Sequence, residues 1–242
     1  MDVTQNLTNI NRTVYANRKI DYIVIHYFGA LGSAAQTCAY FKSVNRKASA
    51  HYFVDDNEIW QCVEDVNAAW HCGDSGKGAL KGICTNANSL GLEMRPYKVS
   101  TKSMLASDAD WYFSDKTIAN TQELVLFLMD KHGVPAVHVI RHYDVTAKRC
   151  PRPWVGDDVN TYYGKTGNQL WGEFKAGLED DRMDGKTIYL KLCDYLREQP
   201  CPDWAKQELQ EAIDAGITDG ARPMDLIPRY QAAIMAKRAM KK

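Results

Sequence analysis

The stretch Ile140-Arg141-His142-Tyr143-Asp144-Val145-Thr146-Ala147-Lys148-Arg149-Cys150-Pro151 completes an apolar run, Ala136 to Ile140, and constrains the fold most strongly. The apolar run predicts a buried β-strand, and the residues after it predict a loop. His142 and Cys150 lie at the two ends of that loop, and imidazole nitrogen and thiolate sulfur are both ligands of zinc. Lys148 would place a positive charge beside the metal, where it can stabilise an oxyanion.

The composition of the 242-residue chain is that of an ordinary globular protein, and its formal net charge is zero. The balanced charge therefore gives no indication of a basic surface that would bind nucleic acid or an anionic membrane. No run approaches the roughly 18 apolar residues of a membrane-spanning helix. Residues 1–6 lack the basic and apolar regions of a signal peptide. The seven cysteines are an odd number without framework spacing, and we expect reduced thiols in a cytoplasmic protein.

Strand-like and helix-like patterns alternate along the first 178 residues, which predicts an α/β fold. Asp55-Asp56-Asn57 joins two short strands and has the chemistry of a hairpin turn. Ser33 and Gly133 are the expected caps of two helices. The expected strands are Lys19–Tyr27, Ala50–Val54, Glu58–Val63 and Asn88–Met94, and the expected helices are Ala34–Val44, Thr117–His132 and Asn168–Leu178.

Two further positions carry groups that could act together with His142 and Cys150. His26 ends the first strand; a lone histidine is more often a hydrogen-bonded core residue, but strand ends are where sites form in α/β sheets. With His26 the set has three ligands, and three protein ligands with a fourth position left to water is the arrangement of catalytic zinc. Glu93 lies within an expected buried strand, where a carboxylate is costly unless partnered, or else it faces solvent.

A groove would be formed by less regular parts of the chain. Trp70 and His71 either line such a groove, or Trp70 simply covers the core. The stretch from Arg95 to Asp115 is polar and aromatic, and it predicts a loop with a strand edge. We expect a groove to run over Trp70, His71 and this loop.

Five sequence blocks, in the same order, resemble the zinc-dependent N-acetylmuramoyl-L-alanine amidases that share a fold with peptidoglycan recognition proteins. The match covers roughly residues 18–178 and implies a central mixed β-sheet flanked by helices. The blocks are Ile23-Val24-Ile25-His26, Ser49-Ala50-His51-Tyr52-Phe53-Val54, Ala69-Trp70-His71-Cys72-Gly73, Asn88-Ser89-Leu90-Gly91-Leu92-Glu93 and His142 to Pro151.

The resemblance assigns a metal and a base. It implies zinc ligands at His26, His142 and Cys150, because cysteine is one of the two residue types found at the third ligand position. It also implies that Glu93 is the catalytic glutamate. Members without a carboxylate there carry a tyrosine at the position of Ala50, so this chain resembles the members that use glutamate.

The resemblance also implies the reaction, which is hydrolysis of the amide between N-acetylmuramate and L-alanine in peptidoglycan. Lys148 matches the lysine that assists at the scissile carbonyl. Trp70 and His71 fall in a block that lines the substrate groove, so they are the expected substrate-binding residues.

The C-terminal part has a different pattern. The charged break 179–185 predicts a linker between a catalytic domain, residues 1–178, and a helical domain, residues 186–242, with helices at Trp204–Ala215 and Ile227–Met240. Asp203–Lys206, Ala215–Gly220 and Arg222-Pro223 resemble short repeats of surface-layer-homology type. This implies binding to the cell wall or dimerisation, and the alternative is a packed helix pair.

Three functions compete for the whole chain. The first is a phage endolysin, held in the host cytoplasm before lysis and acting on the cell wall. The second is a non-catalytic peptidoglycan-binding module, which typically lacks the cysteine ligand that Cys150 supplies here. A bacterial autolysin would have the same sequence features as the first. The third is a nucleic-acid-binding or structural zinc protein, which is disfavoured by the zero net charge and the absence of paired CxxC motifs.

Overall fold

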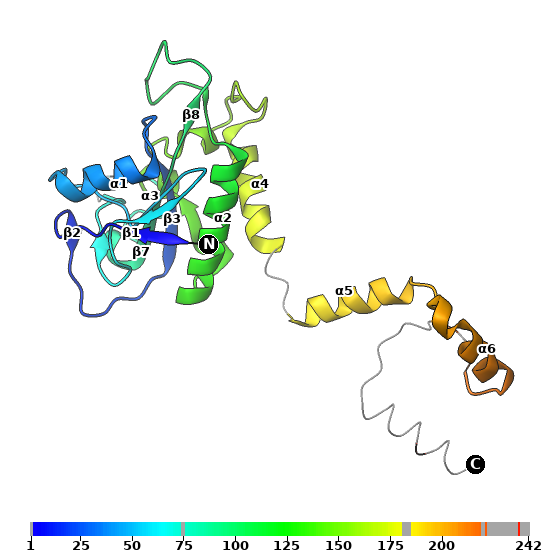
Figure 1. Ribbon diagram of the computed structural model, residues 1–242. Coiled ribbons are helices and arrows are strands. Elements are labelled where there is room, and N and C mark those ends of the chain that lie inside the picture. The colour runs from blue at the N-terminus through cyan, green and yellow to red at the C-terminus, as the bar shows by residue number, and fades with distance from the viewer. Residues whose placement is uncertain (1, 74–75, 181–184, 219–220, 222–236, 238–242) are drawn as a thin grey trace. The chain divides into compact units, whose positions relative to one another are not determined.

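The computed structural model describes the chain except for residues 1, 74–75, 181–184, 219–220, 222–236 and 238–242 (Figure 1). The chain divides into two compact units, Met1–Asp181 and Arg182–Lys242. Each unit is treated by itself below, and the predicted catalytic residues all belong to the first. No helix among the described residues has the length and apolar character that crossing a membrane requires.

The first unit is built on a six-stranded sheet with the order β1-β5-β4-β7-β3-β10. Only β4 and β5 pair antiparallel, and the other neighbours are parallel, so the sheet is mixed as expected. The strands are β1 Val3–Gln5, β3 Tyr22–Tyr27, β4 Tyr52–Val54, β5 Ile59–Gln61, β7 Ser89–Met94 and β10 Val139–Arg141; two small ribbons pair β2 Arg12–Thr13 with β6 Ala68–Ala69 and β8 Tyr97–Lys98 with β9 Trp111–Tyr112.

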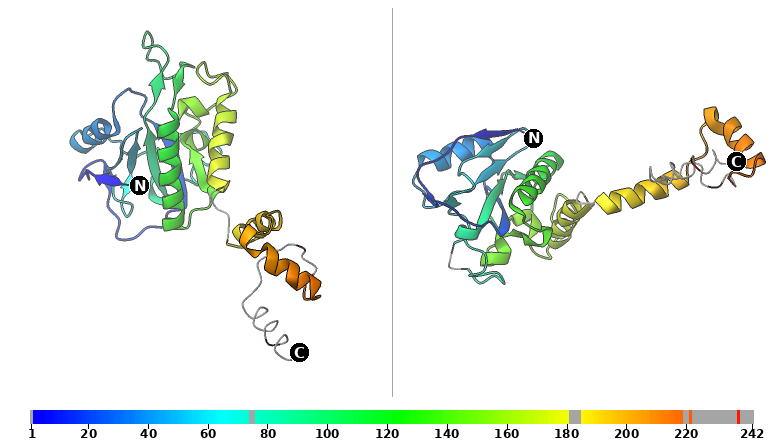
Figure 2. Two further views of the ribbon diagram at one scale, coloured as in Figure 1. Left: turned by 45° about the vertical axis from the view of Figure 1, so that its right-hand side comes forward. Right: turned by 90° about the horizontal axis from the view of Figure 1, so that it is seen from below.

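Helices cover both faces of the sheet (Figures 1 and 2). Helices α2 (Asp115–His132) and α4 (Gly167–Asp180) lie side by side, and their apolar residues pack with Ile23, Ile25 and Leu90 in the main core. Helix α1 (Ala34–Ser43) packs with Phe53 in a second core. Since side chains alternate along a strand, Phe53 faces away from α2. The predicted α/β architecture with flanking helices is confirmed.

Local chemistry explains where these helices begin and end. The Ser33 side chain accepts a hydrogen bond from the Gln36 amide, and the Gln36 side chain bonds back, which is a capping box. The Ser114 side chain caps α2 by accepting a hydrogen bond from the Thr117 amide at 3.1 Å. Gly133 closes α2 with φ of 67°, a left-handed conformation that glycine adopts at little steric cost.

The prediction for the stretch after α2 was wrong in its details. Residues 136–138 form a short 3₁₀ helix, η2 (Ala136–His138), instead of the first half of a strand, and Val137 is 72% exposed. Pro135 starts this turn, and the His138 amide donates to the Pro135 carbonyl at 2.9 Å. The predicted loop after His142 contains a short helix, α3 (His142–Thr146). Two other 3₁₀ turns are η1 (Asn86–Asn88) and η3 (Arg152–Trp154).

The second unit is helical where it is described. It contains α5 (Gly185–Arg197), a 3₁₀ turn η4 (Asp203–Ala205) and α6 (Lys206–Asp214). The predicted helix at Trp204–Ala215 is therefore present, with its first turn tightened. The predicted helix at 227–240 falls outside the described residues, apart from Lys237. Helix α4 extends to Asp180, so it includes the first residues of the predicted linker.

Candidate metal centre

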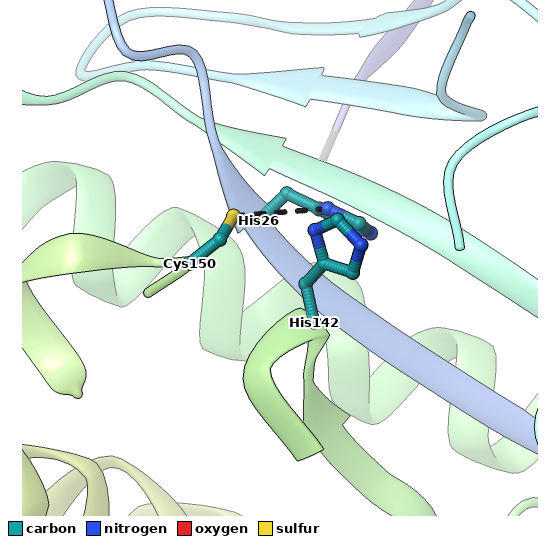
Figure 3. Close-up of side chains that lie close together, drawn as sticks. All are labelled: His26, His142 and Cys150. Carbon is teal, nitrogen blue, oxygen red and sulfur yellow. Dashed lines mark hydrogen bonds between the residues drawn. The ribbon is translucent and has the colours of Figure 1, made fainter. Parts of the chain in front are cut away.

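The three predicted metal ligands come from neighbouring parts of the sheet edge. His26 is near the C-terminal end of β3, and His142 follows β10 directly. Strands β3 and β10 are parallel neighbours in which Arg141 lies opposite Ile25, so His142 emerges beside His26. The ligand atoms of His26, His142 and Cys150 all lie within 4.8 Å of one another (Figure 3). The structure thus brings together three residues separated by up to 124 positions.

The chain between His142 and Cys150 folds back so that both residues reach the same point. The Asp144 carboxylate accepts a hydrogen bond from the Arg141 amide at 2.8 Å, which starts α3. Ala147 ends it with φ of 60°. The Tyr143 amide then donates to the Cys150 carbonyl at 2.8 Å. This closed turn returns Cys150 to the sheet edge.

The donor set fits a zinc ion. Two imidazoles and one thiol are a common zinc combination, and the open fourth position is typical of catalytic sites. His142 Nδ1 is buried and has no hydrogen-bond partner among the described residues, as a nitrogen reserved for a metal would be. The Nδ1 atom of His26 lies 3.9 Å from the Cys150 sulfur (Figure 3).

The protonation of the ligands is set chiefly by burial. Burial lowers the pKa of His142 to about 4 and that of His26 well below 6.5, so both imidazoles are neutral and able to ligate. Burial, with the nearby Glu93 carboxylate, raises the pKa of the Cys150 thiol. Metal binding would therefore displace a proton from Cys150.

A cavity of about 460 Å³ opens onto these residues. Its lining includes every candidate site residue named from the sequence: His26, Trp70, His71, Glu93, His142, Lys148 and Cys150. The tip of the loop between β8 and β9 supplies Ala106 and Ser107 to the wall, and Arg152 donates to the Ser107 carbonyl at 3.1 Å. The sequence predicted that this loop lines the groove but did not identify these two residues, because small residues in a loop carry no distinguishing signal.

Glu93 is the carboxylate of the cavity. It lies opposite His26 in the parallel pairing of β7 with β3, so the two side chains share one face of the sheet. Its Oε2 atom is buried and makes no hydrogen bond to any described residue. Burial raises the pKa of Glu93 to about 8, against the opposing effect of the Lys148 charge. Lys148 itself is exposed at the cavity wall.

The two predicted groove residues differ in their contacts. Trp70 is half-buried, and its indole Nε1 donates to the Thr13 hydroxyl at 2.9 Å. His71 is buried, with Nδ1 3.1 Å from His26 Nε2 and Nε2 3.2 Å from the Ser89 hydroxyl. The Ser89 contact could not be predicted from the sequence, because a serine at the start of a strand is common.

Comparison with known proteins agrees with this geometry. The family model for N-acetylmuramoyl-L-alanine amidase matches residues 16–153, which contain all the candidate site residues. The chain belongs to the N-acetylmuramoyl-L-alanine amidase family. Two curated amidases of Bacillus licheniformis are similar: a probable N-acetylmuramoyl-L-alanine amidase, 37% identical over 56% of this chain, and the amidase CwlL, 31% identical over 70% of it.

This amidase-family chain spans 37% and 48% of the length of those two relatives. Among solved structures, a mutant endolysin from Bacillus subtilis is 27% identical, and the alignment covers 74% of this chain and 99% of that one, with a TM-score of 0.53. The family match, residues 16–153, lies in the unit that carries the cavity.

Proposed function

We propose that the first unit is a zinc-dependent amidase that hydrolyses the bond between N-acetylmuramate and L-alanine in bacterial peptidoglycan. One observation carries the proposal. The atoms of His26, His142 and Cys150 that can ligate a metal lie within 4.8 Å of one another. The same cavity holds the buried carboxylate oxygen of Glu93, which has no hydrogen-bond partner among the described residues. Family membership and the similarity to named amidases support it.

His26, His142 and Cys150 would hold the zinc ion. When bound there, zinc lowers the pKa of a water molecule from about 15.7 towards roughly 7 and polarises a carbonyl. The protein contributes neutral imidazoles, because burial keeps the pKa values of His26 and His142 low.

Glu93 would act as the general base and then as the acid. Its Oε2 is available to accept a proton from the attacking water, because it makes no hydrogen bond to the described residues. The same oxygen would then give the proton to the amine of the departing L-alanine. A pKa of about 8 in the metal-free protein favours the second step, and the positive charges of Lys148 and a bound cation favour the ionised form needed for the first.

Lys148 would stabilise the negative charge that develops on the scissile carbonyl oxygen. It is exposed at the cavity wall, so its ammonium can reach a bound substrate. One such donor is typically worth about 10²–10³ in rate. Trp70, together with the loop that carries Ala106 and Ser107, would line the groove for the glycan and the stem peptide.

We further propose an endolysin-type role, in which the protein acts on the cell wall after accumulating in the host cytoplasm. The similarity of the first unit to a Bacillus subtilis endolysin supports this. The second unit would bind the wall or form dimers, and it exposes Trp204, which is 81% exposed, and Ile217, which is 71% exposed. Removing residues 186–242 should leave the chemistry intact and weaken wall binding or change the oligomeric state.

The test is digestion of purified Gram-positive cell walls. Loss of turbidity together with new L-alanine N-termini, and without new reducing sugars, is the expected result. New reducing sugars would show cleavage of the glycan and overturn the proposal. Binding to walls without any release of fragments would support the non-catalytic binding module in its place.

A further inference from the structure

A series of hydrogen bonds connects the Thr85 backbone carbonyl to the ring nitrogen Nε2 of His26. The Ser89 hydroxyl lies 2.5 Å from the Thr85 carbonyl oxygen. The Ser89 oxygen is also 3.2 Å from His71 Nε2, and His71 Nδ1 is 3.1 Å from His26 Nε2. These residues come from three separate parts of the first unit, the turn Thr85–Ser89, His71 and His26, so the arrangement exists only in the folded protein.

The donor and acceptor of every hydrogen bond in this series follow from the Thr85 carbonyl oxygen at its start. A carbonyl oxygen only accepts, so the single hydrogen of the Ser89 hydroxyl must point at Thr85. The Ser89 oxygen then accepts from His71 Nε2–H. A neutral imidazole has one donor and one acceptor nitrogen, so His71 Nδ1 is the acceptor. The hydrogen that His71 Nδ1 accepts must therefore be carried by His26 Nε2. The lone pair of His26 is thereby on Nδ1, the atom that lies 3.9 Å from the Cys150 sulfur.

We infer that His71 is a positioning residue of the metal centre: it holds His26 in the tautomer and ring orientation that present Nδ1 to the metal. Ligating histidines commonly donate their other ring N–H to a protein acceptor, which fixes the tautomer and raises the basicity of the ligand. The inference rests on the proposed metal site and is independent of the amidase reaction.

The neighbouring residue performs the same task for the second histidine. His142 Nε2 lies 3.2 Å from the Cys72 carbonyl oxygen, which can only accept, so the His142 lone pair is on the buried Nδ1. The segment His71-Cys72 therefore orients both histidines, and the two inward-facing nitrogens are both Nδ1. The Cys72 sulfur also lies 3.3 Å from His71 Nδ1, and this contact agrees with the assigned hydrogen-bond directions only when Cys72 is a neutral thiol that donates to Nδ1.

The His71 ring is held in place from several sides. The amides of His71 and Cys72 both donate to the Asn86 side-chain oxygen, at 2.9 and 2.8 Å. The ring lies against Gly91 of β7 so closely that a Cβ atom at position 91 would come within 2.5 Å of it. Both ring nitrogens face protein atoms. This arrangement suits a rigid support better than a group that must rearrange to bind substrate.

The first test measures the tautomer in the metal-free protein. Long-range ¹H–¹⁵N spectra of histidine-labelled protein should show His26 as the Nε2–H tautomer, with its signals assigned from a His26→Ala spectrum. In His71→Ala we expect His26 to lose this single tautomer. Finding the Nδ1–H tautomer of His26 in the unsubstituted protein would overturn the inference, whether or not the protein binds zinc.

The second test measures zinc affinity with a competing chelator. Asparagine can place its amide oxygen near the position of Nδ1, whereas glutamine places it near that of Nε2. We therefore expect about 10- to 100-fold weaker zinc binding in His71→Ala and His71→Gln, and near-normal binding in His71→Asn. His138→Ala is the control, since His138 contacts the Asp21 carbonyl at 2.9 Å and lies outside the cavity lining. Circular dichroism verifies that each variant is folded.

The outcomes separate the positioning role from its alternatives. If His71→Ala binds zinc as tightly as the unsubstituted protein but raises KM, the residue contacts substrate and the inference is wrong. If His71→Asn and His71→Gln weaken zinc binding equally, a hydrogen-bond acceptor at the position of Nδ1 does not determine the zinc affinity, and the inference is wrong. Absence of zinc binding by the unsubstituted protein would instead refute the proposed function, while the tautomer measurement would still stand on its own.

Discussion

Two partly buried carboxylates of the first unit, Glu93 and Asp65, have opposite surroundings. Glu93 has an oxygen without a hydrogen-bond partner in the described part of the chain, and burial raises its pKa to about 8. Asp65 accepts hydrogen bonds from Tyr52 at 2.6 Å and from Gln61 at 3.1 Å, and it pairs with Lys131 at 2.7 Å and His132 at 2.9 Å.

The different surroundings shift the two pKa values in opposite directions. Burial alone would raise the pKa of Asp65, but the hydrogen bonds from His132, Lys131 and Tyr52 outweigh it and hold the pKa below its usual value. Asp65 thus stabilises the fold as a carboxylate, whereas an ionised Glu93 destabilises it. A buried group whose charge is left without partners is a marker of function, because the fold bears its cost for no structural gain.

The largest loss of activity is expected from a substitution at the metal centre, which lines the same cavity as Glu93. Cys150→Ser should lose zinc and activity together, because hydroxyl oxygen is a much poorer zinc ligand than thiolate. Elemental analysis measures the bound zinc, and the release of wall fragments measures the activity. Cys38→Ser is a matched control, since Cys38 is also a buried free cysteine but lies in the α1 core. A Cys150→Ser protein with full zinc would remove Cys150 from the ligand set.

Glu93→Gln should lower the rate by about 10²–10⁴-fold and keep the zinc bound, because it removes the proton acceptor and leaves the ligands in place. Single-turnover release of fragments, with zinc content measured on the same sample, tests this. A fully active Glu93→Gln protein would show that another group is the base and that the unpartnered oxygen has a different purpose.

Lys148→Met should lower the rate by about 10²–10³-fold, since it removes one charge from the developing oxyanion while keeping the length of the side chain. Zinc affinity should change little, because Lys148 is not a ligand. Lys116→Met, which removes an exposed lysine outside the cavity lining, serves as the comparison and should retain activity. Equal losses in the two variants would argue against a specific role for Lys148.

On the other side of the comparison, Asp65→Asn should lower the free energy of unfolding by about 2 kcal/mol at pH 7, the usual worth of hydrogen bonds to a charged group. The pKa of Asp65 is depressed in the folded state, so its contribution is fully present above the unfolded value of about 3.9 and is lost progressively as pH falls from there through the lower folded value. Urea unfolding at pH 7 and at pH 3 should therefore show the variant and the unsubstituted protein converging in acid. An equal difference at both pH values would contradict this.

Glu93→Gln should also change the stability of the metal-free protein. The raised pKa means that folding opposes ionisation, so the unsubstituted protein loses stability as pH rises from about 4.5 to about 8. The variant should be more stable by roughly 4 kcal/mol at pH 8, the free-energy equivalent of raising the carboxyl pKa from about 4.5 to about 8, and by nothing at pH 4. Thermal unfolding with a chelator present tests it. A variant that is less stable at pH 8 would show that the Glu93 carboxylate has partners.

Much of this protein could be predicted from the sequence because the signals are local. The strands at β3, β4, β5 and β7, the turn between β4 and β5, and the caps Ser33 and Gly133 follow from residue type and spacing alone. Family motifs supplied the candidates His26, Glu93, Lys148 and Cys150, and the structure places all of them in one cavity. Their individual roles remain predictions.

Other features were decided only by the tertiary structure. Strand β1 has little apolar pattern, and it forms because the edge of β5 is available for pairing. The placing of Glu93 on the same face as His26 depends on the register of β7 against β3. The contact of His71 with His26 joins residues 45 positions apart, and Ser89 completes it from another strand. A sequence determines which groups are available, but hydrogen bonds between distant residues depend on distances that only the folded chain sets.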